Sequence, residues 1–78
     1  MKYIIRVTGN YGPNPYVTNV EKGDTEEYPY TDTWGSSSKD KAMRFKCRRQ
    51  AQRIVNHLNR YMKDKNHSLV YSVHSWSQ

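Results

Sequence analysis

The chain has 78 residues, which we expect to form one small domain, residues 1–78, with no room for a second. A hydrophobic fraction of 35% and a mean hydropathy of −1.09 predict a thin core, while the 13% of aromatic residues argues against a disordered chain. The formal net charge of +6 arises in residues 39–78, which hold ten Lys or Arg and two acids.

The sequence also indicates a compartment. One cysteine excludes an intramolecular disulfide and favours a reducing environment. No segment reaches the roughly 20 apolar residues of a membrane span, and we find no apolar core of a signal peptide. We therefore expect a cytoplasmic protein without a membrane partner.

The first half of the sequence predicts strands. Apolar and polar residues alternate over residues 2–8 and again over residues 16–21. Residues 9–15, which contain two Gly, two Pro and two Asn, predict a loop, so the two strands should pair as a hairpin. Residues 26–34 suit a third strand, which Pro29 confines to a sheet edge or a bulge.

The second half predicts one helix and a closing strand. Residues 35–38 should form a flexible connector, and residues 40–46 a turn or extended piece that docks Ala42, Met43 and Phe45 on the core. Apolar residues then repeat with a helical period over residues 48–64, with Cys47 at the N-cap. Because a thiol caps poorly, we expect Cys47→Ser to stabilise the protein. Alternation over residues 68–74 predicts the last strand.

These elements predict an α+β fold. We expect a small antiparallel or mixed sheet of three to four strands, with one amphipathic helix packed on one face, in the order β-β-(β)-α-β. The direction in which the last strand pairs stays open. The predicted core residues are Ile5, Val7, Tyr16, Val20, Phe45, Ala51, Ile54, Val55, Leu58, Met62, Leu69, Tyr71 and Val73.

The predicted helix places its apolar residues on one side and a row of cations on the other. No acid lies between Lys41 and Lys63, so no ion pair along the helix offsets the like charges, and this favours an anionic partner. Cations along one surface suit phosphate binding; the alternative is a solvated face that only maintains solubility. The candidate macromolecule-binding residues are Lys41, Arg44, Lys46, Arg48, Arg49, Arg53, Arg60 and Lys63.

Aromatic and acidic residues mark the first half of the chain. The candidate aromatic anchors, Tyr28, Tyr30 and Trp34, could stack on bases, fill a protein interface or replace aliphatic residues in the thin core. The segment 21–32 holds five of the seven acids. It either mimics phosphate, covers a basic patch of a partner, pairs with the helix of a second copy, or is a solvated loop.

No catalytic motif emerges. His57, His67 and His74 are dispersed, and no local motif joins Cys47 to a histidine as a nucleophile–base pair. No ligands cluster at metal-binding spacing. We therefore expect no enzyme, no cofactor and no metal site.

The segment Ala42–Ile54, after an opening Met-Lys-Tyr-Ile-Ile strand, resembles a pattern found in small bacteriophage and prophage accessory proteins. These proteins show a hairpin, an Ala-x-x-Phe-x-Ser/Thr-x-x-x-Ala entry into one helix, and a short closing strand; Cys47 stands at the Ser/Thr position. The resemblance covers most of the chain. It implies an accessory protein that acts in the cytoplasm of a host cell, and some such proteins inhibit host defence, as anti-CRISPR proteins do. No functional residues carry over.

Together, these features favour a non-enzymatic, phage-type binding protein. We expect it to inhibit or modulate a host macromolecular machine, such as a CRISPR effector, by occupying its surface through the basic helix face. The alternative is direct, weakly sequence-specific binding of nucleic acid through the same face. The expected partner is a host protein or nucleoprotein complex, or the nucleic acid itself; the oligomeric state stays open.

Overall fold

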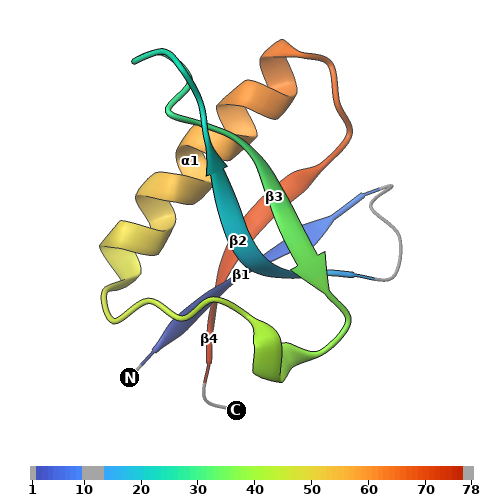
Figure 1. Ribbon diagram of the computed structural model, residues 1–78, viewed down its shortest axis with the longest axis vertical. Helices are drawn as coiled ribbons and strands as arrows, with labels where there is room; N and C mark the ends of the chain where they lie inside the picture. Colours follow the sequence, from blue (N-terminus) through green and yellow to red (C-terminus); the bar gives the residue numbers. More distant parts are fainter. Residues whose placement is uncertain (1, 10–13, 77–78) are drawn as a thin grey trace.

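A computed structural model describes residues 2–9 and 14–76 (Figure 1). Within these residues, four strands form one antiparallel sheet in the order β3-β2-β1-β4. The elements are β1 (Tyr3–Thr8), β2 (Tyr16–Lys22), β3 (Tyr30–Ser36), the short 3-10 helix η1 (Lys39–Lys41), α1 (Arg48–Asp64) and β4 (Val70–Ser75). The α+β fold and the order of its elements are confirmed, and β4 pairs antiparallel with β1. Part of the predicted first loop, residues 10–13, lies outside the described residues.

The core lies between α1 and one face of the sheet. Apolar residues recur three and four positions apart along α1, so their side chains form a single stripe. The buried residues of α1 are Ala51, Ile54, Val55, Leu58 and Met62. This stripe packs in one cluster with Ile5, Val7 and Tyr71 of β1 and β4. In Figure 1, α1 runs along one side of the strands, with the β2–β3 hairpin beside it.

The predicted helix boundaries, residues 48–64, are confirmed, and the C-terminal end has a specific stop. Asn66 has a φ of 62°, in the left-handed region that Asn tolerates better than most residues. The N–H of His67 donates to the carbonyl of Met62 (2.8 Å), and the N–H of Asn66 donates to that of Lys63 (3.1 Å). These two bonds form a Schellman motif, which satisfies carbonyls of the last turn and directs the chain toward β4.

β1 and β2 pair over a short stretch of the sheet. The two strands form a hairpin as predicted, but their register contains one pair, Arg6 with Tyr16. Beyond it, the connector before α1 takes the place of β2: Tyr3 and Phe45 exchange two backbone hydrogen bonds of 2.8 Å each. The Met43 N–H also donates to a carbonyl of β2 (2.9 Å). The connector therefore ties β1 to β2 where they diverge.

Side chains of this connector also join the core. Ala42 and Phe45 are buried and Met43 packs partly on the core, so the predicted docking of all three is confirmed. Ile4 is buried as well, although the predicted core omits it and Ala42. With Ile4 and Ile5 both buried, β1 is covered on both faces, which strict alternation on a half-exposed strand does not predict.

The predicted core is wrong in part on β2. Val17 is fully buried, whereas Tyr16 and Val20 are only partly buried. The β2–β3 register shifts between Val17 and Asn19, which leaves Thr18 as an extra residue. Because this bulge resets the alternation, Val17 and Val20 both pack toward α1 although they lie three positions apart.

Two strand boundaries also differ from the prediction. The third strand begins after residues 26–29 because Pro29 cannot donate a ladder hydrogen bond; its carbonyl instead accepts from the Gly23 N–H (2.9 Å) and closes the hairpin. It is an edge strand, as predicted, and it includes the first two residues of the expected connector 35–38. The last strand is shifted from residues 68–74 to β4. Two predicted core residues near it are only partly buried: Leu69 and Val73.

An α1 side chain covers part of the free edge of β4. The Tyr71 N–H donates to Asn59 Oδ1 (2.7 Å), and Asn59 Nδ2 donates to the Tyr71 carbonyl (3.0 Å). The amide therefore pairs with the strand as a neighbouring backbone would, and it protects this position from pairing with another chain.

We predict that Asn59→Ala lowers the free energy of unfolding by about 1–3 kcal/mol, because the two hydrogen bonds between the Asn59 amide and the Tyr71 backbone are lost. The matched control is Asn56→Ala on the exposed face of the same helix, which should change stability by about 0.5 kcal/mol or less. Urea unfolding followed by circular dichroism measures both. Equal effects of the two substitutions would contradict the role of Asn59.

Candidate functional site

The outward side of α1 carries the predicted row of cations. Because the apolar stripe fixes the rotation of the helix, Arg49, Arg53 and Arg60 point away from the sheet and are exposed. At the N-terminal end, a shallow hollow of about 600 Å³ lies along this side. Its lining residues are Arg48, Arg49, Gln52, Arg53, Asn56 and His57. We name Arg48, Arg49 and Arg53 the N-terminal basic face.

The charges of the N-terminal basic face are uncompensated. Among the residues that the structure describes, the only ion pairs involve Arg60, so Arg48, Arg49 and Arg53 pair with no carboxylate. The first turn of α1 contains no acid. Its arginines therefore add to the partial positive charge of the helix N-terminus, an arrangement that costs helix stability and attracts anions.

Cys47 occupies the N-cap position, as predicted, with an extended backbone and no capping hydrogen bond from its side chain. The nearby backbone N–H groups of Gln50 and Arg49 nevertheless lower the pKa of the Cys47 thiol, and the charges of Arg49 and Arg53 act in the same direction. This direction is the one expected at the N-terminus of a helix flanked by arginines.

The C-terminal half of α1 is covered differently, by the loop between β2 and β3. Two features of this loop fix the position of Tyr28. The Tyr28 N–H donates to Thr25 Oγ1 (3.1 Å), and the backbone at Gly23 passes close to the Tyr28 carbonyl. A Cβ on Gly23 would lie 2.0 Å from the Tyr28 carbonyl oxygen, so only glycine fits. This turn aims the Tyr28 side chain at the helix.

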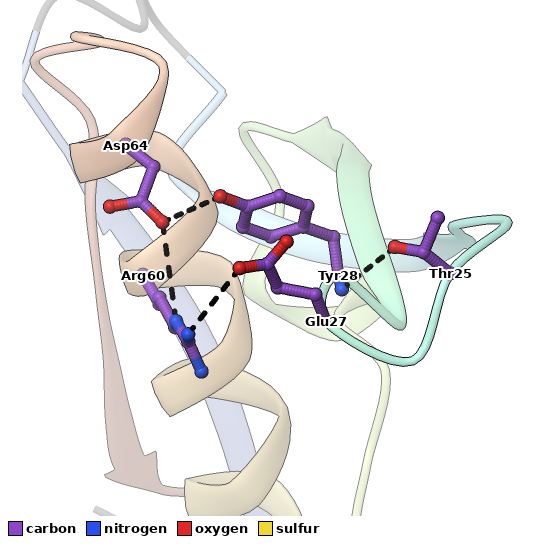
Figure 2. Close-up of polar contacts among 5 residues, drawn as sticks. All are labelled: Thr25, Glu27, Tyr28, Arg60 and Asp64. Atoms are coloured by element: carbon purple, nitrogen blue, oxygen red, sulfur yellow. Dashed lines mark hydrogen bonds and ion pairs between the residues drawn. The ribbon is translucent and has the colours of Figure 1, made fainter.

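Figure 2 shows Tyr28 and Glu27 reaching from this loop toward Asp64 and Arg60 of α1. The Tyr28 hydroxyl donates to Asp64 Oδ2 (2.6 Å), and the Tyr28 ring meets the Tyr61 ring edge-on at 5.2 Å between centroids. Arg60 lies 3.7 Å from Glu27 and 4.0 Å from Asp64. We name these four residues (Glu27, Tyr28, Arg60 and Asp64) the loop–helix clamp.

The clamp corrects the predicted binding face at Arg60. Asp64 lies just beyond the acid-free stretch, and it forms with Arg60 an i,i+4 ion pair that this stretch did not predict. Glu27 belongs to the acidic segment, which in this respect covers its own helix rather than standing free in solvent. Because these side chains are 40–60% exposed, the ion pairs contribute little to stability, but they balance the charge of Arg60.

The other predicted cations do not all extend the row. Lys41 ends η1 and Lys46 precedes the N-cap; both are exposed. Arg44 stacks on Trp76, with its guanidinium carbon 4.0 Å from the ring centroid, and it donates to the Asp40 carbonyl (2.9 Å). Lys63 is exposed on the last turn of α1. The predicted face of eight residues is therefore split over three regions.

The three predicted aromatic anchors are also separated. Tyr28 is held in the clamp, and Tyr30 packs against the core with its ring 6.1 Å from that of His57. Trp34 is 54% exposed on β3. Its neighbour Thr33 bonds Tyr71 inside the core, so Trp34 projects from the face opposite α1. None of the three offers a free ring beside the N-terminal basic face.

The clamp generates a pH prediction. The hydrogen bond to Asp64, then burial and the charges of Asp64 and Glu27, raise the pKa of Tyr28 from 10.0 to about 12, while Arg60 opposes them. A raised pKa in the folded state means that the bond stabilises the protein below pH 10.0 and that this contribution is lost as the pH rises through about 12. Over this range, the urea midpoint of the wild type should fall more steeply than that of Tyr28→Phe. Parallel curves would contradict the bond.

The helix start generates a second prediction. Cys47→Ser should raise the urea midpoint, because a hydroxyl accepts a hydrogen bond from the free N–H groups of the first turn better than a thiol does. Cys47→Ala, which removes any side-chain acceptor, is the matched control and should not raise it. A Ser variant no more stable than the Ala variant would refute the capping role of position 47.

Within the described residues, no group of three His, Cys, Asp or Glu side chains could hold a metal ion, and no helix has the length and apolar character needed to cross a membrane.

We compared the chain with family models, curated proteins and solved structures, and none of the three comparisons gives a match.

Proposed function

We propose that this protein is a non-enzymatic nucleic-acid-binding protein that contacts backbone phosphates through the N-terminal basic face. The observation that supports this most is the set of exposed guanidinium groups of Arg48, Arg49 and Arg53, which have no carboxylate partner in the described part of the chain. Each guanidinium presents a planar fork of donors that matches two phosphate oxygens.

The spacing of the arginines suits a continuous anion. Arg49 and Arg53 are one helical turn apart, about 6 Å along the axis, and Arg48 widens the row across the helix. Gln52 lies between Arg49 and Arg53, and Asn56 lies just beyond Arg53. Gln52 Nε2 donates to Asn56 Oδ1 (2.9 Å), and the remaining N–H groups of these exposed amides suit phosphate or sugar oxygens. Since phosphate contacts position a protein without reading bases, we expect weak sequence preference.

The first hypothesis from the sequence, steric inhibition of a host machine, stays a prediction. In that hypothesis, Tyr and Trp side chains provide anchors for the basic face, because aromatic residues and Arg dominate the energetics of protein interfaces. Tyr28 and Tyr30 are engaged within the molecule, and Trp34 projects from the other face. The arrangement therefore supports phosphate contact more directly than an anchored protein interface.

A salt titration tests the proposal. We predict that the protein binds labelled oligothymidylate with a log–log salt dependence, and that Arg49→Gln with Arg53→Gln reduces the slope by about 1.4, or about 0.7 for each lost phosphate contact on a single strand. Arg60→Gln should have a smaller effect than Arg53→Gln because Arg60 already faces two carboxylates. Fluorescence anisotropy at several salt concentrations measures all of these.

The control removes two charges elsewhere. The double variant Lys22→Gln with Lys65→Gln also removes two positive charges, one on β2 and one just beyond the end of α1. This variant should keep most of the slope of the salt dependence. Equal losses in both double variants would mean that only net charge matters. No binding at low salt would refute the proposed function and would leave an acidic protein surface as the target to test.

A further inference from the structure

The sheet face turned away from α1 gathers a second set of cations. In β1 and β4, alternate residues face opposite sides: Ile5 and Tyr71 enter the core, so Arg6 and His74 project from the other face. Arg6 pairs with Ser72 across the two strands. Ser72 Oγ lies 2.9 Å from His74 Nε2, so the imidazole is held beside Arg6.

The connector before α1 brings two more cations to this face. Lys39 Nζ lies 5.5 Å from the Trp76 ring centroid, and the guanidinium carbon of Arg44 lies 4.0 Å from it. Trp76 itself continues β4, because its N–H donates to the Lys2 carbonyl (2.7 Å). We name Arg6, Lys39, Arg44, His74 and Trp76 the outer-face cluster.

No carboxylate in the described part of the chain forms an ion pair with the outer-face cluster. Both ion pairs among the described residues belong to Arg60, on the opposite side of the sheet. Arg6 stacks over Tyr16 (5.2 Å to the centroid), and its Nε is buried without a hydrogen-bond partner in the described part of the chain. The cluster therefore holds a desolvated donor and several like charges close together, which costs stability unless an anion is present.

The pKa of His74 is lowered partly by the cations of the outer-face cluster. Burial lowers the pKa of the His74 imidazole below its usual 6.5, and Arg6 and then Lys39 lower it further. The groups that face it are thus Arg6 from β1, Lys39 from η1 and Ser72 from its own strand. The cations Arg6 and Lys39 therefore make the immediate surroundings of His74 positive.

We propose that the outer-face cluster is a second phosphate-binding site, so that one molecule holds two nucleic-acid segments, one on each side of the sheet. The inference rests on the proposed function of the N-terminal basic face. Guanidinium, ammonium and imidazole donors from three elements converge on one area, which suits the several acceptor oxygens of a phosphate group. The two surfaces lie on opposite sides because α1 and the cluster occupy opposite faces of the sheet.

The histidines provide one reporter for each surface. His57 lines the hollow of α1, His74 belongs to the outer-face cluster, and His67 follows the end of α1 as an internal control. We expect oligothymidylate to shift the ring signals of His57 and His74 in NMR spectra, and to raise the pKa of His74 because a nearby anion favours its protonated form. Lys39→Gln with Arg44→Gln should weaken the His74 response about tenfold and leave that of His57 unchanged.

A capture experiment then tests bridging directly. Protein is added to an immobilised oligothymidylate, and retention of a second, labelled oligothymidylate is measured. We expect loss of retention with Lys39→Gln and Arg44→Gln, while binding to the first strand persists; Lys22→Gln with Lys65→Gln is the charge-matched control. Circular dichroism confirms that each variant is folded.

The outcomes separate the two proposals. A response of His57 alone, or full retention by the Lys39 and Arg44 variant, would overturn the second site and leave the proposed function standing. A response of His74 alone would support phosphate binding by the outer-face cluster and refute both the proposed function and bridging. No response from either histidine would overturn both.

Discussion

Burial of one stripe of α1 is the constraint on which the rest of the structure depends. The chain has a thin core, and fully burying one large aliphatic side chain stabilises a protein by about 1.5–3 kcal/mol, so the contact of α1 with β1 and β4 is a large share of what holds the fold. Ala51 and Leu58 are fully buried in that contact. Because the stripe can face only one way, the contact also fixes which residues meet solvent. The arginines of the opposite side are exposed as a direct consequence.

The β2–β3 loop divides the exposed side of α1 into two unlike halves. Toward the C-terminus, Glu27 and Asp64 balance Arg60, and the Tyr28 hydroxyl holds the loop in place. Toward the N-terminus, no acidic segment of the described chain reaches Arg49 or Arg53. The acidic segment therefore limits the free cationic surface to the end of the helix where the backbone dipole is also positive. This concentration of charge is what the proposed function uses.

How well a feature could be predicted from the sequence depends on how far apart in the sequence the interacting residues lie. The helix boundaries, the order of the elements and the docking of Phe45 follow from local periodicity, which one sequence contains in full. The burial of Val17 does not, because it depends on a bulge that only the pairing of β2 with β3 creates. The clamp joins residues 36 positions apart, through a turn that Gly23 permits. The outer-face cluster brings Arg6 and Trp76 together through the fold of the whole chain. The alternation over residues 2–8 indicates only that Arg6 and Ile5 lie on different faces of the strand.

The central claim is that free guanidinium groups at the N-terminal end of α1, and not the row as a whole, contact phosphate. The most direct measurement is an NMR titration of the arginine Nε–Hε signals with oligothymidylate at low salt. The account predicts that the signals of Arg49 and Arg53 shift at the lowest concentrations while that of Arg60 stays in place. A shift of Arg60 with Arg49 and Arg53 unmoved would contradict it.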